Sequence, residues 1–315
     1  MDTLELKPVT ATSPDLRTKA ADAPVRLAPV KAAAPPWRGK ALRQMSGDAL
    51  LRHAVGACLA HARPNAEALA RGSADPEHVH QLRVGLRRLR SAVRGLSRFA
   101  GTLPANRDAA ITPVFDALGE ARDRFVVDTA LVPRLRRAGA PAVDPGGQSA
   151  QALATHLQAL VRGERFQQSL ARLQAFADAE PLERAAPGDG LAHLVGRLRK
   201  LARQVTRAAM RFDDLSFEDR HRARKRLKRL RYLAEFAAPA FDRGDVKRWL
   251  RAVEPAQDAL GEHIDHALAG RRFERLAARD PRAWFAAGWL RAKSERSGRA
   301  AARALRRLQE AKAFW

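Results

Sequence analysis

Two basic rows of side chains, each spaced for one face of a helix, are the part of this sequence best suited to chemistry. Both rows begin with a histidine and follow the spacing i, i+3, i+7 and i+10. Their members are His80, Arg83, Arg87, Arg90 and Arg94 in the first row, and His221, Arg224, Lys228 and Arg231 in the second. No carboxylate lies between His78 and Arg98 to balance the first row. Because like charges on one helix repel one another, the rows predict an anion from outside the chain.

Phosphate groups are the ligands that suit these rows. An arginine guanidinium presents a planar fork to two phosphate oxygens, and a lysine ammonium supplies a mobile point charge. Four side chains at this spacing extend over roughly 15 Å of a helix. Two such rows facing each other would line a channel for a chain of phosphates.

The histidine at the head of each row stands five residues after a predicted N-cap, Asp75 or Ser216, near the positive end of the helix dipole. We predict that His80 and His221 contact phosphate. Cationic neighbours disfavour a protonated imidazole, and a bound polyanion reverses that effect. Ligand binding is therefore expected to take up protons near neutral pH.

Other basic side chains could extend the site. Two further helices carry the rows Lys200, Arg203, Arg207, Arg211 and Arg296, Arg299, Arg303, Arg306. A solvated basic face explains these rows as well as ligand binding does, and Lys200, Arg203, Arg207 and Arg303 are included as candidate ligands. Arg88 and Arg229 lie on the far side of their helices from the histidine rows, so a structural or outer-surface role is favoured for them.

The composition supports a polyanionic partner and excludes several classes of site. The 315 residues contain 58 Lys and Arg against 34 Asp and Glu, a net charge of +24. The partner could be nucleic acid, an acidic membrane surface or another phosphate polymer. Cys58, the one cysteine, rules out an intrachain disulfide and a thiolate metal cage, and a buried, unreactive thiol is expected there. No apolar run approaches the ~18 residues of a membrane span, and no signal-peptide core is present, so a cytoplasmic protein is expected.

No motif in the sequence indicates catalysis. The basic rows contain no clustered His and carboxylate set at metal-ligand spacing, and we find no Gly-rich phosphate loop, Ser-His-Asp signature or nucleophile elbow. We therefore expect a binding protein that needs no cofactor and no metal.

The elements that position the rows are helices throughout, because the sequence is rich in Ala and Leu and shows no strand-like alternation. Residues 1–41 are Pro- and Ala-rich without a hydrophobic period, which predicts a disordered tail or linker. The remaining chain, 42–315, divides at a Pro- and Gly-rich stretch into 42–180 and 190–315. Eight helices are predicted, at about 46–71, 76–101, 105–137 and 150–179, a fifth that includes residues 191–211, a sixth that begins after the cap Ser216, and two more at about 245–279 and 281–315.

The two halves of the chain are repeats of one another. An offset of 141 residues superimposes the basic rows and their caps, and takes Arg88 to Arg229. A second pair of segments, ITPVFDALGEARD (111–123) and VEPAQDALGEHID (253–265), matches at an offset of 142. Two motifs at nearly one offset predict two four-helix units related by an approximate two-fold axis, each with one basic helix. Asp123 and Asp265, which close the second motif, are either surface acids paired with nearby arginines or groups that orient a basic residue of their own half.

With the paired rows, Leu118-Gly119, Arg122-Asp123, Leu260-Gly261 and Asp265, the segment of about 43–313 resembles the CHAD domain (conserved histidine α-helical domain). The resemblance implies two four-helix bundles around a basic central pore that binds inorganic polyphosphate, and association with polyphosphate granules. By this resemblance the members of the two rows line the pore. CHAD domains are often fused to a triphosphate tunnel domain. Glu5 and Lys7 do not complete the acidic signature of that fold, so no triphosphatase activity is expected.

Two functions remain open from the sequence. The leading interpretation is non-catalytic binding of long-chain polyphosphate. The alternative is a non-specific DNA- or RNA-binding protein that uses the same basic helices. The basic rows have no interleaved aromatic side chains for base stacking, which weighs modestly against single-stranded nucleic acid.

Overall fold

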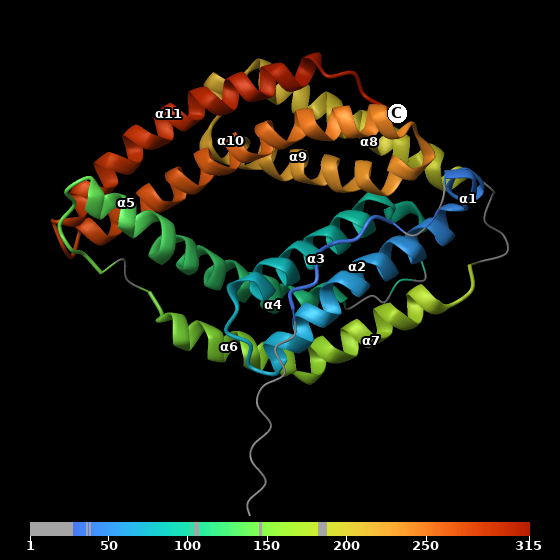
Figure 1. The fold of residues 1–315 in the computed structure, drawn as a ribbon, viewed down its shortest axis with the longest axis horizontal. Helices are drawn as coiled ribbons and strands as arrows, with labels where there is room; N and C mark the ends of the chain where they lie inside the picture. Colours follow the sequence, from blue (N-terminus) through green and yellow to red (C-terminus); the bar gives the residue numbers. More distant parts are fainter. Residues whose placement is uncertain are drawn as a thin grey trace, which may run out of the picture.

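The protein is an assembly of helices, as the sequence predicts (Figure 1). The computed structural model describes residues 28–35, 37, 39–101, 103, 107–144, 147–181 and 188–315, and these residues include no strand. The helices of the first half are α1 (Gly39–Gln44), α2 (Gly47–Ala70), α3 (Pro76–Gly95), α4 (Arg107–Val126), α5 (Val132–Arg137), α6 (Ala150–Arg162) and α7 (Glu164–Asp178). Those of the second half are α8 (Asp189–Met210), α9 (Phe217–Ala237), α10 (Arg243–Ala277) and α11 (Ala283–Glu310).

The helices that carry the basic rows begin at the caps expected from the sequence. Asp75 accepts a hydrogen bond from the backbone N–H of Glu77 at 2.8 Å, and Pro76 fills the first position of α3. Ser216 accepts one from the N–H of Asp219 at 3.1 Å at the start of α9. These side chains satisfy donors that the first helical turn leaves free, and so determine where each row begins.

The predicted helix over 150–179 is wrong in one respect, because it is two helices. Gly163 adopts an extended backbone (φ −56°, ψ 133°) that ends α6, and α7 starts at the next residue. A Cβ at this position would come within 3.1 Å of the carbonyl oxygen of Leu160, so the sharp turn favours glycine. The turn lets both short helices pack against α2 and α4.

The predicted helix over 105–137 is interrupted as well. A π-helical turn, Val127–Leu131, separates α4 from α5, and Pro133 follows within the first turn of α5. Proline cannot donate the i→i−4 hydrogen bond, and a wider turn before it accommodates that loss. Helix α4 continues without such a break through Pro113, and α10 continues in the same way through Pro255.

An apolar stripe on α3, beside the first basic row, forms part of the core. Leu82, Leu86 and Leu89 are at most 2% exposed, and the residues that the offset of 141 pairs with them in α9 are buried to the same degree. Cys58 is buried, as expected, and burial raises the pKa of its thiol to about 12.

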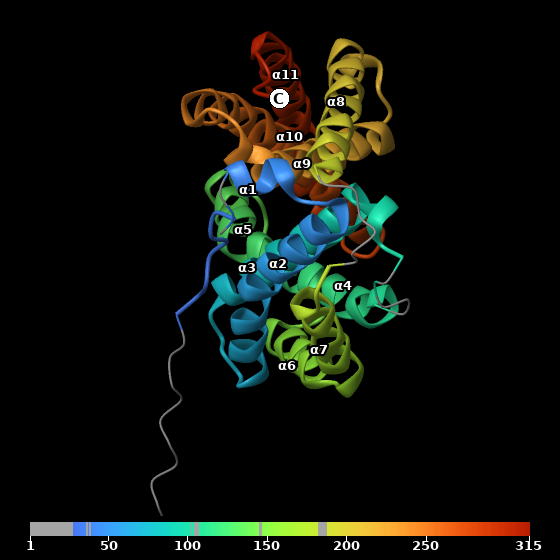
Figure 2. The ribbon, with the colours of Figure 1, turned by 90° about the vertical axis from the view of Figure 1, so that its right-hand side faces the viewer.

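Helices α8–α11 lie on one side of the molecule and most helices of the first half on the other (Figure 1, Figure 2). One core cluster draws side chains from both halves, and α3 packs against α9 where the halves meet. A second cluster packs α5 and the π-helical turn against the far ends of α10 and α11. The two basic helices therefore lie next to each other at the centre of the fold.

Residues before the predicted boundary at 41 pack against the helices. Trp37 is 7% exposed, stacks on Phe236 and donates its indole N–H to the carbonyl of that residue at 3.3 Å. Val30 exchanges two hydrogen bonds with Asn65, and Arg43 in α1 donates to the carbonyl of Ala240. A single tryptophan in a Pro- and Ala-rich stretch produces no period, so the sequence did not reveal this packing. The predicted tail over residues 1–27 lies outside the described residues.

Candidate anion-binding site

The contact between α3 and α9 brings the two basic rows together. Burial and the charges of Arg224 and Arg87 lower the pKa of Lys228 to about 6. Arg83 acts in the same direction, and Asp265 opposes it. Cations from α3 thus lie close enough to affect a lysine on α9. We call Arg83, Arg87, Arg224 and Lys228 the central basic cluster.

Two arginines of this cluster have buried N–H groups that no described residue accepts. Burial and the charge of Arg87 lower the pKa of Arg83 to about 10, which leaves the guanidinium charged at neutral pH. Asp123 opposes this shift. The Nε atoms of Arg83 and Arg224 are buried, and neither has a hydrogen-bond partner among the described residues. Buried N–H groups of this kind are costly to leave unsatisfied, so they favour an acceptor supplied by a ligand.

The glycine of the second repeated motif leaves space for an arginine of the basic row in its own half. A Cβ at Gly119 in α4 would lie 3.3 Å from Nη2 of Arg83, and a Cβ at Gly261 in α10 would lie 3.7 Å from Nη2 of Arg224. The glycine of each half therefore lies beside the arginine at the second position of the basic row. This contact gives a physical reason for both motifs to recur at nearly the same offset.

The two acids that close the second motif act on those same arginines. Asp265 forms an ion pair with Arg224, with Oδ1 3.4 Å from Nη2. Asp123 lies near enough to Arg83 for its charge to raise the pKa of the guanidinium. Asp265 is therefore both an acid paired with a nearby arginine and a neighbour of a basic-row residue in its own half. Both interpretations offered by the sequence apply to it.

The pKa values of both leading histidines are lowered, in the direction that the sequence predicts. Burial is the first cause for His80, followed by the charge of Arg122. For His221 burial again comes first, followed by Lys225 and Arg224. The sequence pointed to the cationic neighbours and missed the larger effect of burial. Nδ1 of His221 is buried and has no partner within the described part of the chain.

Phe115 is a functional neighbour that the sequence analysis missed. The guanidinium carbons of Arg83, Arg87 and Arg90 lie 5.2, 6.0 and 5.0 Å from the centroid of its ring. An aromatic face attracts cations without using their N–H donors. The aligned second motifs could have revealed this difference, because Gln257 occupies the place of Phe115 in the other half.

The end of the second row is organised by polar groups instead. Arg231 donates from Nη1 to Oε1 of Gln257 at 2.9 Å and from Nε to Oε1 of Glu235 at 3.1 Å. The same Glu235 forms an ion pair with Arg88, which is buried against Tyr232 and Phe236. Arg88 thus has the structural role that the sequence analysis favours.

Several predicted ligands do not join the central basic cluster. Arg94, the last member of the first row, is exposed and lies near Arg229. The auxiliary candidates Lys200, Arg203, Arg207 and Arg303 lie on exposed faces of α8 and α11. Over the ranges that the structure describes, none of these four forms a hydrogen bond or ion pair with the cluster.

Comparison with known proteins identifies the family of this fold. The family model of the CHAD domain matches residues 53–274, which is more than half of the chain and includes both basic rows. The chain belongs to the CHAD domain family. It is also similar to the crystal structure of the CHAD domain from the plant Ricinus communis, with a TM-score of 0.73 and 25% sequence identity, over 91% of this chain and 98% of that one. No curated protein matches the chain.

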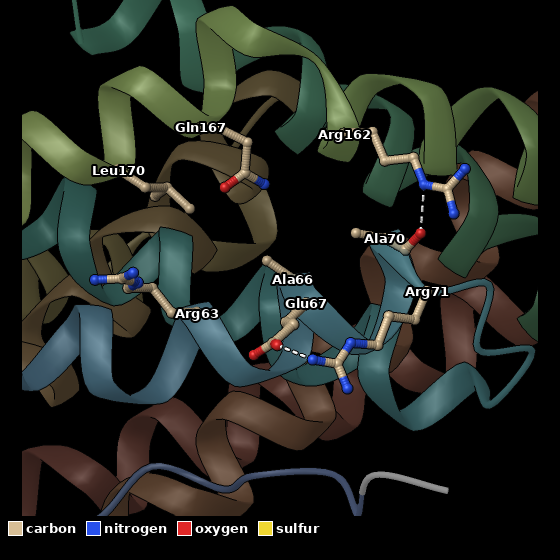
Figure 3. A pocket seen from close by; sticks show the side chains of 8 residues that line it. All are labelled: Arg63, Ala66, Glu67, Ala70, Arg71, Arg162, Gln167 and Leu170. Atoms are coloured by element: carbon tan, nitrogen blue, oxygen red, sulfur yellow. Dashed lines mark hydrogen bonds and ion pairs between the residues drawn. The ribbon is translucent and has the colours of Figure 1, made fainter. Parts of the chain in front are cut away.

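A pocket of about 470 Å³ lies away from the basic rows, between the C-terminal end of α2 and the helices α6 and α7 (Figure 3). Arg63, Arg71 and Arg162 line it, but Arg71 pairs with Glu67 and Arg162 donates to the carbonyl of Ala70. These interactions join lining residues to one another and occupy their polar groups. The pocket lining contains no residue of either basic row.

The described residues contain no group of three or more His, Cys, Asp or Glu side chains arranged to hold a metal ion. In the same part of the chain, no helix combines the length and the apolar character needed to cross a bilayer.

Proposed function

We propose that this CHAD-family protein binds inorganic polyphosphate between α3 and α9, without catalysing its turnover. The observation that carries the proposal is the packing of α3 against α9, which brings Lys228 close to arginines of both basic rows. This lysine lies among three arginines, and its pKa is about 6 in the absence of a ligand. A chain of phosphates placed beside it would supply the negative charge that Asp265 provides only in part.

Polyphosphate fits the chemistry of the central basic cluster better than a compact anion does. The polymer carries about one charge per phosphate and offers only oxygen atoms as contacts. Arginines with unsatisfied buried N–H groups can each bind two of those oxygens. Donors that extend along two adjacent helices suit a linear ligand, because they can contact successive phosphates. We propose that the phosphate chain occupies a basic pore between the rows.

We further propose that this binding places the protein at polyphosphate granules. A granule presents many copies of the same polymer, so modest affinity for each segment gives stable attachment. A fluorescent fusion in cells that accumulate granules should concentrate on them. The same fusion carrying Arg83→Ala and Arg224→Ala should stay diffuse, and granule attachment by that variant would contradict the proposal.

A competition experiment tests the proposal against nucleic-acid binding. Polyphosphates of defined length compete with single- and double-stranded DNA at about 150 mM salt, where non-specific electrostatic binding is weakened. We expect tighter binding of polyphosphate per charge, and a loss of about 100-fold in its affinity in Arg83→Ala with Arg224→Ala. Equal affinity per charge for DNA would favour the nucleic-acid alternative.

The matched control for net charge is Arg172→Ala with Arg251→Ala, two exposed arginines on α7 and α10. This pair removes the same charge and should change the affinity less than about threefold. Chain-length analysis of polyphosphate after long incubation tests the non-catalytic part of the proposal. Shortening that depends on the protein would overturn it.

A further inference from the structure

Three helices meet beside the end of the first basic row. The imidazole of His193 in α8 donates from Nε2 to the carbonyl of Gly95 in α3 at 3.1 Å. A Cβ on Gly95 would come within 2.6 Å of Leu233 in α9, so α3 and α9 are in direct contact there. The junction of α3, α8 and α9 is therefore closely packed around Gly95.

Four arginines surround this junction. Arg94 directly precedes Gly95, Arg197 lies one helical turn after His193, and Arg229 lies one turn before Leu233. Residues four apart share a helix face, so Arg197 and Arg229 point toward the side on which the three helices meet. Arg226 lies a further turn back on α9. The four residues are called the junction arginines below.

The junction arginines act on one another. Burial lowers the pKa of Arg229, and the charges of Arg94, Arg197 and Arg226 lower it further. Nε of Arg197 is buried and has no partner among the residues that the structure describes. Arg94 is exposed, so the cluster is open to solvent. None of the charges that act on Arg229 belongs to the central basic cluster.

The repeat shows what this cluster lacks. The offset of 141 residues takes Arg88 to Arg229, and takes Arg94 to Glu235. In one case the pair is Arg88 with Glu235, an ion pair in which the arginine is buried. In the other, the equivalent residues are two arginines, Arg229 and Arg94. A position that holds a carboxylate in one copy thus holds a second cation in the other.

We propose that the junction arginines form a second anion-binding site, which takes a phosphate group in the place that the carboxylate of Glu235 occupies in the repeat-related pair. The ligand is a free phosphate or pyrophosphate, or the end of a phosphate chain, since all present the same tetrahedral anion. Guanidinium groups from three helices can enclose such an anion, and bidentate contacts satisfy N–H groups that now repel one another. This site is separate from the proposed pore.

The test replaces Arg94 by the residue that stands at its repeat position. Arg94→Glu supplies Arg229 with a carboxylate from within the chain. Without ligand, we expect this variant to unfold at a temperature a few degrees above that of the wild type. Calorimetric titration with pyrophosphate should show one binding site fewer than the wild type, or a loss of at least tenfold in affinity where a single site is seen. Arg94→Glu with wild-type stoichiometry and affinity would overturn the proposal.

Two controls isolate the site. Arg172→Glu makes the same change of net charge on an exposed face of α7 and should keep the wild-type titration. Arg83→Ala with Arg224→Ala should keep the pyrophosphate site that Arg94→Glu removes, even though its affinity for long chains falls. Loss of that site in the Arg83 and Arg224 variant would place pyrophosphate in the central basic cluster and contradict a separate junction site.

The source of the phosphate is distinguished by the choice of ligand. Inorganic phosphate, pyrophosphate and long-chain polyphosphate are titrated in the Arg83→Ala, Arg224→Ala background. Binding of the two small anions marks a site for free phosphate, and binding of the polymer alone marks a site for chain ends. Each result supports a site only if Arg94→Glu in that background abolishes it. The pore proposal fails independently, if the background variant retains full affinity for long chains.

Discussion

The two basic rows follow one sequence pattern but end in different surroundings. In the first half, Arg83, Arg87 and Arg90 lie around the ring of Phe115, which attracts cations and leaves their donors available. In the second half, Arg231 is bound by Gln257 and Glu235, which occupy its donors. The charges of the two rows are thus alike, and their partners differ. We therefore expect the first row to offer more free donors to an anion, and the polar contacts of the second row to contribute more to stability.

The largest expected effect concerns Glu235. Glu235→Ala leaves Arg88 buried without its ion-pair partner, and breaking a buried pair in this way is worth about 3 kcal/mol. We expect a clear fall in the urea midpoint of unfolding. Glu254→Ala, an exposed acid of α10, serves as the control and should cost less than about 0.5 kcal/mol. Equal midpoints for the two variants would contradict a stabilising role for the polar contacts of Glu235.

The next prediction concerns the protonation of Lys228, a group that has no counterpart in Arg87, its repeat-related residue. With a pKa of about 6, Lys228 is mostly neutral at pH 7 in the free protein, and a bound polyanion raises that pKa. Binding should therefore take up protons at pH 7, and affinity should fall by up to about tenfold per pH unit as the pH rises above 6. Calorimetry in buffers of different ionisation enthalpy measures the uptake.

Lys228→Arg provides the matched control, because arginine stays charged. This variant should retain binding and lose most of the proton uptake, leaving the fraction due to His80 and His221. An uptake that is unchanged in Lys228→Arg would assign it to the histidines instead. Heats that are independent of the buffer would contradict both assignments.

The same lysine makes a prediction about stability without ligand. Its pKa is lower in the folded state than in the unfolded chain, so the unfolded chain binds more protons between about pH 6 and pH 10. Stability should therefore rise with pH across this window. Lys228→Met should flatten that rise, and an equally steep profile in this variant would show that other groups cause it.

A smaller effect compares the far ends of the rows. Arg90→Ala should weaken polyphosphate binding by about tenfold, since no hydrogen bond within the described residues occupies its donors. Arg231→Ala should weaken it by no more than about threefold, because Glu235 and Gln257 already use its donors. Titration at about 150 mM salt measures both variants. The reverse order of losses would show that the second row binds the polymer more strongly.

The smallest effect tests the space beside each arginine. Gly119→Ala brings a methyl group to 3.3 Å from Nη2 of Arg83, so this side chain must move by a few tenths of an ångström. Gly261→Ala meets Arg224 at an ordinary distance of 3.7 Å. We expect about a twofold to threefold loss of affinity for the first variant and almost none for the second. Identical affinities would mean that Arg83 adjusts without loss.

Much of this arrangement could be predicted from local rules. The caps Asp75 and Ser216 and the stripe of Leu82, Leu86 and Leu89 follow from helix geometry alone. The repeat offered one contact between its motifs, that of Asp265 with a basic residue of its own half, and Asp265 pairs with Arg224. Periodicity and capping are properties of short segments, and they can be read without knowledge of the tertiary structure.

What the sequence missed depends on packing between distant segments. Trp37 shows no pattern of its own and is buried only because Phe236, 199 residues away, offers a surface. The break at Gly163 depends on where α2 and α4 lie, and a lone glycine in a helical stretch does not indicate it. Arg94 belongs to the basic row by spacing, yet the crossing of α3 and α9 places it beside Arg229.

The shared core has a consequence for how the molecule unfolds. A duplicated sequence suggests two halves that could melt independently, but one cluster of buried side chains includes helices from both. At one end α1 packs against α8 and the turn at Ala238–Ala240, and at the other α5 packs against α10 and α11. Separating the halves would expose apolar surface at both ends at once. We therefore expect the described fold to unfold as one cooperative unit, with both copies of the repeat losing their structure together.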